Sequence, residues 1–524
     1  MANKIFKTSK VLVMIFLLVS VVSPLLKLLS VVQTSDLIEI INSPQFSDMI
    51  FNSVFTTAIS TFISVGLAWA LAWCISRSNI KHKSLFTMLF TLPMLIPSIS
   101  HGMGLVLLFG DNGIITNIFG ININLYGYNG IIIGSILYSF PVAFLMLLDA
   151  FKYEDFTIYE AAEVFGLSKF QKFKNITLPN MQKSLISVVF AVFTLIFTDY
   201  GVPLVVGGKI MTMPVYMYRE VIGLLDFSKG AIIGVVLLIP AVIAFIFDLK
   251  TSDDSSASTI MKPYVISKNK TRDKIASSFC LLMVILISLP IFTFAYLSLV
   301  KHYPTDMSIS LSNLSEYFKL GIGNYLINSL SISLSTSLIG TGFIYYTAYL
   351  TSRSKKTFSN MTLHLIAMIS LAIPGIVLGL SYVLFFKQSI IYGTLIILIL
   401  VNMVHFFASP YLLAYNSLNV FNENFEDVSE VLGVSRFGML RDVYIPCTIE
   451  TIVEIFSYIF VNSMVTISAV SFLANFRNMP LALMVPQFDA QSLVGATAFV
   501  SIIIFVINLM LKLTIYSFKR YIKK

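Results

Sequence analysis

The chain has 524 residues, of which 57% are hydrophobic and 12% are charged, whereas a soluble globular domain carries about 25% charged residues. This composition excludes a water-soluble domain, and it also excludes an intrinsically disordered chain, which is poor in apolar side chains. Cys74, Cys280 and Cys447 are single and far apart, so the sequence predicts neither a disulfide nor a metal site. An integral membrane protein remains.

The net charge of +9 comes from basic residues in short clusters between long apolar runs. Such clusters are typical of membrane proteins, in which they fix the orientation of the helices, rather than of nucleic-acid-binding surfaces. The sequence therefore predicts contact with membrane lipid and no nucleic-acid partner.

Apolar runs long enough to cross a membrane occur throughout the chain, since a bilayer core about 30 Å thick needs about 20 apolar residues in a helix. The runs that meet this length are 10–31, 52–75, 85–109, 129–151, 183–203, 230–248, 275–299, 326–350, 361–386, 389–415, 449–473 and 491–516. They predict an all-α polytopic membrane protein with about 12 transmembrane helices. The first run is too long for a signal peptide and no small-residue cleavage site follows it, so we expect it to be retained.

The lysines and arginines predict the orientation of these helices, because cytoplasmic loops hold the excess of basic residues. With the N-terminus inside, the inner segments hold 26 of the 35 lysines and arginines, and the outer loops hold seven. We therefore expect both termini to lie in the cytoplasm.

The chain divides into two similar halves. Residues 251–274 form the longest polar stretch and predict a cytoplasmic linker between a first repeat at 1–250 and a second at 275–524. Residues 52–78 align without a gap on residues 328–354. The positions that are identical in the two copies include Asn52, Ser53, Gly66, Ala72, Ser76, Arg77 and Ser78 of the first copy. Each half has six predicted spans, so the two halves are predicted to be parallel repeats.

A second match between the halves lies in two long inner loops, 153–182 and 416–448. The first loop contains, at fixed spacing, Glu160-Ala161-Ala162, Gly166 and Ile176-Thr177-Leu178-Pro179. At the same spacing the second loop contains Asp427-Val428-Ser429, Gly433 and Val443-Tyr444-Ile445-Pro446.

Local chemistry predicts two short helices in each loop. The glycine is expected to end the first helix in the left-handed conformation. Ser168 or Ser435 is expected to cap the second helix, and the proline to lie in the first turn of the next span. Phe170 and Phe173 then share one face of the second helix, and Phe437 and Leu440 hold the equivalent places. This apolar face needs a partner, which is either another protein or the helix ends of the same chain.

The pattern EAA-x3-G-x9-I-x-LP of the first loop resembles the coupling loop of the membrane subunits of binding-protein-dependent ABC importers. The resemblance covers residues of about 50–250 and 325–520. The second loop departs from the pattern at Asp427-Val428-Ser429, so the resemblance implies equivalent helices but not equal strength of docking.

In that family each loop binds one ATPase subunit. The resemblance implies as partners two cytoplasmic ABC ATPase subunits and an extracellular or periplasmic solute-binding protein, in a bacterial plasma (inner) membrane. The ATPase-coupling residues that it implies are Glu160, Ala161, Ala162, Gly166, Phe170, Phe173, Ile176, Pro179, Asp427, Gly433, Phe437, Leu440 and Pro446.

The fusion of two halves resembles the double permeases of iron(III), thiamine and 2-aminoethylphosphonate importers. Within this group, the runs 197–203 and 460–473 resemble the phosphonate members most. The resemblance thus implies a small solute, with 2-aminoethylphosphonate or another phosphonate expected first and iron(III) second.

The chain lacks a phosphate-binding loop of its own. Its nearest approach to G-x4-GK[ST] is Gly207-Gly208-Lys209-Ile210, which has neither the leading glycine nor the hydroxyl residue that holds Mg²⁺. We therefore expect no enzymatic activity and no cofactor or metal bound by this chain, with ATP used by the partner subunits.

An ion-coupled secondary transporter of the major-facilitator architecture is the alternative, because it shares the twelve spans, the parallel halves and the inner termini. Such a carrier needs titratable groups near the middle of the membrane, whereas Asp149 and Asp199 lie near predicted helix ends.

Polar residues within the apolar runs are candidates for lining a substrate pathway, although each of them can instead serve helix packing. The candidates are Ser98, His101, Ser139, Asp199, Ser370, Ser381, His405, Ser409, Thr466 and Ser468.

Overall fold

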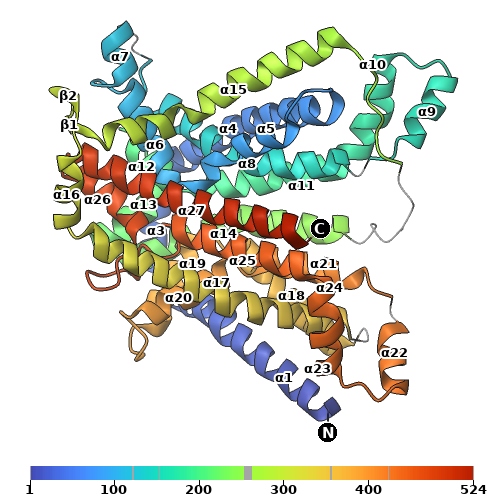
Figure 1. The fold of residues 1–524 in the computed structure, drawn as a ribbon. Helices are drawn as coiled ribbons and strands as arrows, with labels where there is room; N and C mark the ends of the chain where they lie inside the picture. Colours follow the sequence, from blue (N-terminus) through green and yellow to red (C-terminus); the bar gives the residue numbers. More distant parts are fainter. Residues whose placement is uncertain are drawn as a thin grey trace. The chain divides into compact units, whose positions relative to one another are not determined.

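The structure is a computed structural model that describes residues 2–120, 123–152, 154–252, 262–354, 357–422 and 424–522. Within these ranges the chain is helical apart from loops and one antiparallel hairpin, in which Val300 pairs with Ile309 (Figure 1). Residue 153 of the first predicted loop, residue 423 of the second and residues 253–261 of the predicted linker lie outside the described residues.

The chain forms two compact units. The unit that we call the α4 unit consists of Ser43–Val215 and Val242–Leu297. Its elements are α4 (Pro44–Arg77), α5 (Lys83–Phe90), a 3₁₀ turn (Leu92–Leu95), α6 (Ser98–Phe109), α7 (Ile114–Phe119), α8 (Tyr128–Lys152), α9 (Thr157–Val164), α10 (Lys169–Lys172), a π turn (Phe173–Thr177), α11 (Leu178–Phe197), α12 (Gly201–Val206) and α15 (Lys270–Leu297). Two helices, α13 (Met213–Gly223) and α14 (Phe227–Ser252), each belong partly to one unit and partly to the other.

The other unit, which we call the α17 unit, consists of Met1–Asn42, Tyr216–Ala241 and Ser298–Lys524. Its elements up to α18 are α1 (Ala2–Leu17), a π turn (Leu18–Val22), α2 (Ser23–Val31), α3 (Thr34–Asn42), β1 (Val300–His302), β2 (Asp306–Ile309), α16 (Ser312–Lys319), α17 (Ile322–Ser352) and α18 (Phe358–Ile369). The remaining elements are a 3₁₀ turn (Ser370–Ala372), α19 (Gly375–Phe386), α20 (Leu395–His405), α21 (Ala408–Asn419), α22 (Asn424–Val431), α23 (Arg436–Met439), a π turn (Leu440–Tyr444), α24 (Ile445–Cys447), α25 (Ile449–Val465), a 3₁₀ turn (Leu481–Leu483), α26 (Met484–Ala490) and α27 (Val494–Ile522).

The described residues contain nine helices that are long and apolar enough to cross a membrane, and twelve candidate spans if each of three bent helix pairs is counted as one. Each of the twelve predicted runs overlaps one of these candidates. The all-α polytopic fold class is thereby confirmed.

Several predicted runs are nevertheless not single straight helices. The run 85–109 is broken between α5 and α6, where Pro93 and Pro97 lie, and the run 361–386 bends by 109° next to Pro374. Proline breaks a helix because it has no backbone N–H and because its ring clashes with the preceding turn. The run 183–203 also ends early, since α11 stops at Phe197 and α12 begins at Gly201. At these three places the predicted span is an interrupted helix.

The same packing recurs in the two units. α4 packs against α8 and α11, and α17 packs against α21 and α25. The buried face of α4 carries a stripe of small polar residues, and α17 carries a similar stripe. These stripes contain Ser53, Thr57, Ser60 and Ser64 on α4 and Ser329, Ser333, Thr336, Ser337 and Gly340 on α17. Small side chains let membrane helices approach closely, and their hydroxyls can bond across the contact, as Ser64 does with Ser139 of α8 at 2.9 Å.

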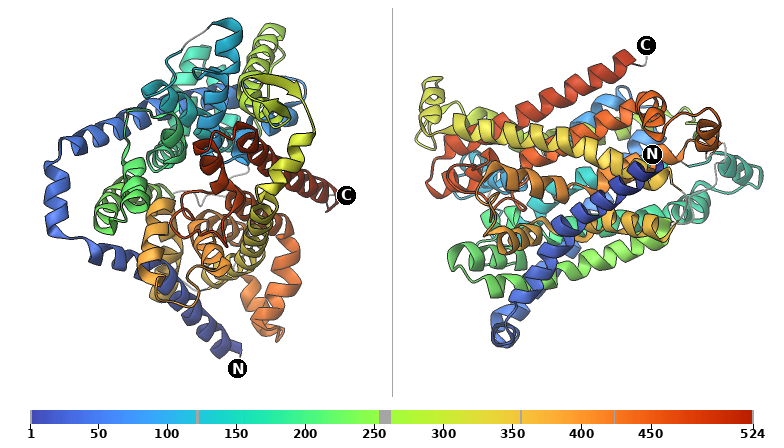
Figure 2. Two further views of the ribbon diagram at one scale, coloured as in Figure 1. Left: turned by 90° about the vertical axis from the view of Figure 1, so that its left-hand side faces the viewer. Right: turned by 90° about the horizontal axis from the view of Figure 1, so that it is seen from below.

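The helix that begins each half belongs to the unit built around the other half. α15 packs against α4, α5 and α6, while α1 packs against α17 and α18. Figure 2 shows α1, in dark blue, beside the yellow and orange helices of its own unit. The predicted limits 1–250 and 275–524 describe the sequence repeats and remain a prediction, because the compact units cut across them.

Gly130 of α8 is closely packed and leaves no room for a larger side chain. A Cβ at Gly130 would lie 2.3 Å from the carbonyl oxygen of Leu125 and 2.8 Å from Cβ of Val206, whereas a Cβ at Gly66 of α4 would meet nothing within 4 Å. We predict that Gly130→Ala destabilises the protein by about 1–3 kcal/mol, the usual cost of overpacking. Gly66→Ala should be neutral or stabilise it by about 0.5–1 kcal/mol through helix propensity. Thermal unfolding of the two purified variants in detergent compares them, and equal midpoints would contradict the packing.

Candidate functional site

The first loop folds as two short helices joined by a tight turn. Gly166, two residues beyond the last residue of α9, terminates this helix, and its φ of +69° is left-handed as predicted. The backbone N–H of Gly166 donates to the backbone carbonyl of Glu163 at 3.0 Å, and that of Leu167 donates to the backbone carbonyl of Ala162 at 3.0 Å. This is the pattern of a glycine-terminated helix. Ser168 and Gln171 form a reciprocal capping box that begins α10. A π turn continues α10 into α11, with Pro179 in the first turn.

The second loop repeats this design in the α17 unit. Gly433, two residues beyond the last residue of α22, has a left-handed φ of +67°. The Ser435 hydroxyl accepts from the backbone N–H of Gly438 at 3.0 Å to cap α23. Pro446 lies in the short helix α24, and the chain then bends by 80° before α25. The predicted equivalence of the helices is thus seen in the structure, but the first copy runs on into its span whereas the second bends.

Around its glycine turn, each loop carries three large apolar side chains that are at least 70% exposed. In the first loop they are Val164, Phe165 and Phe170, which are 88%, 81% and 73% exposed. In the second loop the residues at the same spacing are Val431, Leu432 and Phe437, which are 87%, 70% and 70% exposed. We call these two sets the apolar triplets. Their repetition at equivalent positions marks them as contact surfaces, because exposed apolar groups of this size need a partner.

The second apolar residue of each short helix points the other way. Phe173 is half-buried and packs edge-on against Trp73 of α4 with 5.9 Å between ring centroids. Leu440 is buried. Phe173 thus packs against its own chain, which is one of the two partners that the sequence left open, and Leu440 is likewise buried, whereas Phe170 and Phe437 stay exposed.

The remaining predicted coupling residues divide into anchoring and exposed positions. Ala162 and Ile176 are buried with Tyr159 in a small apolar cluster under the first loop, and Ser429 is buried at the position equivalent to Ala162. Ala161 and Asp427 are exposed. The Glu160 carboxylate contacts Nζ of Lys262 at 2.5 Å.

A buried ion pair anchors the first loop to the end of α4. Arg77, the last residue of α4, forms a salt bridge with Glu154, and both side chains are 4% exposed. The Tyr159 hydroxyl donates to the Glu154 carboxylate at 3.0 Å and lies 2.7 Å from the Thr177 hydroxyl. Burial raises the pKa of the Tyr159 phenol above its ordinary value, so the phenol keeps the proton that it donates.

A second ion pair, in which Arg353 is buried and Glu426 is partly exposed, anchors the second loop to α17. Arg353 donates from Nε to Oε1 of Glu426 at 2.8 Å, and from Nη1 to the carbonyl of Phe421 at 2.8 Å. The Tyr444 hydroxyl donates to the same carboxylate at 2.5 Å. Arg353 aligns with Arg77, but its carboxylate comes from α22, at the position that Tyr159 holds in the first loop. Both loops are therefore held by an ion pair between the arginine and a glutamate, but the glutamate comes from a different position in each loop.

Sequence reasoning missed these anchors and four of the six residues of the apolar triplets. It noticed Arg77 and Arg353 as repeated identities but gave them no role, and an arginine repeated at the end of a span could have been the signal. It also passed over Val164, Phe165, Val431 and Leu432, although the alignment of the two loops matches these apolar residues.

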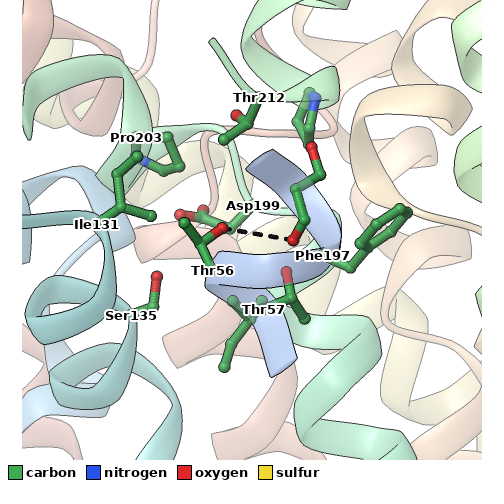
Figure 3. Close-up of a pocket in the computed structure, with 11 residues that line it drawn as sticks. Thr56, Thr57, Ile131, Ser135, Phe197, Asp199, Pro203 and Thr212 are labelled. Atoms are coloured by element: carbon green, nitrogen blue, oxygen red, sulfur yellow. Dashed lines mark hydrogen bonds between the residues drawn. The ribbon is translucent and has the colours of Figure 1, made fainter. Parts of the chain in front are cut away.

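Among the predicted pathway residues of the first half, the structure brings Ser98 and Asp199 together. Asp199 and several hydroxyl side chains, including Thr56 and Ser135, line a small pocket of the α4 unit together with apolar side chains (Figure 3). The Asp199 carboxylate accepts from the backbone N–H of Val202 at 2.9 Å and from the Ser98 side chain. Asp199 thus binds a backbone N–H in the first turn of α12 as well as lining the pocket.

The other two candidates of this half serve helix packing. Ser139 bonds to Ser64, and buried His101 has Nδ1 3.2 Å from the carbonyl of Pro97.

In the second half, His405 and Ser468 meet at the N-terminus of α19. A Cβ at Gly375 would lie 2.3 Å from the Ser468 hydroxyl and 2.9 Å from Nε2 of His405, so these polar groups approach the backbone closely. The remaining candidates lie elsewhere in the α17 unit. Ser370 is in the turn before α19, Ser381 bonds to the Leu378 carbonyl, Ser409 bonds to Tyr458, and Thr466 ends α25. Among the described residues, no three His, Cys, Asp or Glu side chains could hold a metal ion.

The anchor of the first loop generates a stability prediction. Arg77→Gln leaves the buried Glu154 carboxylate without its charge partner, which typically costs about 3–5 kcal/mol. Lys172→Gln is the matched control. Nζ of Lys172 lies 3.6 Å from the carboxylate of Glu163, whose side chain is 76% exposed, and exposed ion pairs contribute about 0–1 kcal/mol to the free energy of unfolding. Thermal unfolding should show a much lower midpoint for Arg77→Gln alone. Equal midpoints would mean that the pair does not hold the loop.

Comparison with known proteins agrees with this duplicated design. The chain is 27% identical over 418 residues to the ferric transport system permease protein FbpB of Actinobacillus pleuropneumoniae, covering 76% of this chain and 60% of that protein. It is 25% identical over 399 residues to a putative FbpB of Haemophilus influenzae, covering 73% and 63%. A thiamine transport system permease protein, ThiP of Brucella suis, is 28% identical over 145 residues, covering 26% and 27%. The chain thus spans less than two thirds of the length of these relatives.

The two halves also match one family separately. Residues 63–249 and residues 339–524 each match the inner membrane component of binding-protein-dependent transport systems. Each match contains one loop with its glycine turn, its apolar triplet and its buried anchor. The chain therefore belongs to the family of binding-protein-dependent transport system inner membrane components, as a fused double permease.

Proposed function

We propose that this chain forms the translocation pathway of an ABC importer, and that its two loops each dock on one ATPase subunit. The observation that supports this most is the apolar triplet, repeated at equivalent positions of both loops. A solute-binding protein would deliver the solute from the other side of the membrane. ATP is used by the partner subunits, and this chain binds no cofactor. Membership of the family makes the secondary transporter the weaker alternative.

The buried anchors supply the mechanical link that such a function needs. When two ATPase subunits close on ATP, the loops docked on them move. Because Arg77–Glu154 and Arg353–Glu426 tie the loops to α4 and α17, each helix follows its own loop. The close packing of α4 and α17 with their neighbours then moves whole helix groups, which opens the pathway to one side of the membrane at a time.

The loops define the orientation in the membrane. ATPase subunits bind in the cytoplasm, so the loops and the basic residues near them face inward, as the distribution of lysine and arginine predicts. We propose a multi-pass location in a bacterial plasma membrane with both termini cytoplasmic.

The solute is proposed to be ferric iron. Two matches that cover 76% and 73% of this chain are ferric transport permeases, whereas a match to a thiamine permease covers 26% of it. The phosphonate resemblance remains a prediction that none of these relatives supports. Asp199 and the hydroxyl groups of its pocket offer oxygen atoms, the ligand type that suits a hard, highly charged cation.

The glycine turns test the coupling role of the loops. A Cβ at Gly166 or Gly433 would meet nothing within 4 Å, so only the left-handed backbone is strained by a substitution. We predict that Gly166→Val misdirects α10 and lowers both uptake and recovery of the ATPase by at least about fivefold, because the strain exceeds about 1 kcal/mol. Gly433→Val should have a smaller effect on recovery, since the second loop lacks the Glu-Ala-Ala sequence.

Gly166→Asn is the matched control, because asparagine tolerates the left-handed region. It should restore most of the uptake and the co-purification. Normal uptake and normal ATPase recovery with Gly166→Val would show that the loop is not the coupling element.

Uptake assays test the proposed solute. Cells that make this chain together with its ATPase and binding protein should accumulate radioactive iron(III), and the uptake should be lost with an ATPase that cannot hydrolyse ATP. Labelled thiamine and 2-aminoethylphosphonate serve as competing substrates in the same cells. ATP-dependent accumulation of either compound without iron uptake would replace the iron proposal and leave the importer proposal standing.

A further inference from the structure

The segment that precedes α15 lies against the first loop. We call residues 262–264 the strap. The carbonyl of Lys262 accepts from the backbone N–H of Phe156 at 2.9 Å, and the backbone N–H of Lys262 donates to the Asp155 carboxylate at 3.2 Å. Pro263 favours an extended Lys262, which presents both backbone groups to the loop. Asp155 accepts several hydrogen bonds, and these lower the pKa of its carboxyl, with the largest effect from the backbone N–H of Thr157. The Asp155 carboxylate therefore stays charged.

The ring of Tyr264 closes over the buried anchor. Its centroid lies 3.4 Å from Cζ of Arg77, 5.0 Å from the ring of Phe156 and 5.2 Å from that of Tyr159. An aromatic face at this distance attracts a guanidinium group. Tyr264 therefore contacts the arginine that holds the loop and the aromatic side chains of the loop itself.

The strap leads directly into a second spanning helix. α15 begins at Lys270, six residues after Tyr264. The Asp273 carboxylate in its first turn accepts from the backbone N–H of Asn79, just beyond the end of α4, at 3.0 Å. The loop, the end of α4 and the start of α15 are thus joined at one place.

The α17 unit shows a related contact made by a different residue. Phe6 of α1 lies under the Arg436 guanidinium with 4.5 Å between Cζ and the ring centroid, and it packs edge-on against Tyr349 at 6.2 Å. The Tyr349 hydroxyl in turn donates to the carbonyl of Arg436 at 2.8 Å. In each unit, an aromatic side chain on or beside the helix contributed by the other half therefore touches the loop region.

We propose that Tyr264 is a positioning residue that makes α15 move together with the first coupling loop. This inference rests on the proposed importer function. Without the ring, the ATPase can still bind the exposed triplet, but the movement of the loop reaches α15 only through the backbone bonds of Lys262 and the bond between Asn79 and Asp273, so it is transmitted less completely. The expected defect is therefore poor transport for each ATP hydrolysed, with normal assembly.

Amide hydrogen exchange tests the structural half of the proposal on the purified chain, without any partner. Tyr264→Ala should speed the exchange of residues 156–167 by at least about tenfold, because the loop loses its cover and opens locally more often. Tyr264→Phe keeps the aromatic face and should behave as the wild type. Val265→Ala, a change at an exposed neighbour, controls for changes to the segment in general, and unchanged exchange in α8 shows that each variant is folded. Equal loop exchange in Tyr264→Ala and the wild type overturns the proposal.

The transport half is measured on the assembled complex in vesicles. The Tyr264→Ala variant should co-purify with a normal amount of ATPase, yet it should transport at least about threefold less solute for each ATP hydrolysed. In the Tyr264→Phe variant the ratio of solute transported to ATP hydrolysed should equal that of the wild type. Faster loop exchange with an unchanged ratio overturns the positioning role. If the wild-type chain itself recovers no ATPase, the importer proposal fails and this inference fails with it. If the wild type couples normally and Tyr264→Ala does too, only this inference fails.

Discussion

A charged arginine is costly to bury at the end of an apolar helix, and this cost shapes both loops. Arg77 and Arg353 are 4% and 5% exposed, and a buried charge needs a partner of opposite sign with further hydrogen bonds. The partner of Arg77 is Glu154 in the first loop, and the partner of Arg353 is Glu426 in the second loop. Closing the pair fixes where the loop begins and presents its glycine turn and apolar triplet away from the helices.

The same constraint suits the loops to the mechanical role that we propose for them. A loop that was held only by exposed contacts could move on its own, whereas a buried pair that is broken at high cost moves with the helix that carries the arginine. α4 and α17 are in turn closely packed through their small polar stripes. Force applied at the loop therefore reaches the membrane helices through groups that have no low-energy alternative arrangement. The two anchors use different carboxylate positions, which is consistent with separate adjustment of two copies of one design.

The sequence predicted those features that depend on local chemistry. Apolar run length located the spans, and the loop helices followed from Gly166 with its left-handed φ, from Ser168 with its capping box, and from the position of Pro179. Features that depend on residues far apart in the chain were beyond it. Phe170 and Phe173 are equivalent by helical spacing, and only the presence of Trp73 separates an exposed ring from a packed one. Likewise, nothing in the polar stretch 251–274 indicated that Tyr264 would lie on Arg77.

The central claim is that the outward side chains of both loops, and not their inward neighbours, contact the ATPase subunits. A photoreactive amino acid placed singly at Phe170, Phe437, Phe173 and Leu440, followed by irradiation of the assembled complex, tests this claim most directly. Phe170 and Phe437 should crosslink to the ATPase, whereas Phe173 and Leu440 should crosslink within this chain. Crosslinking to the ATPase from the inward positions, or from none of the four, would contradict the account.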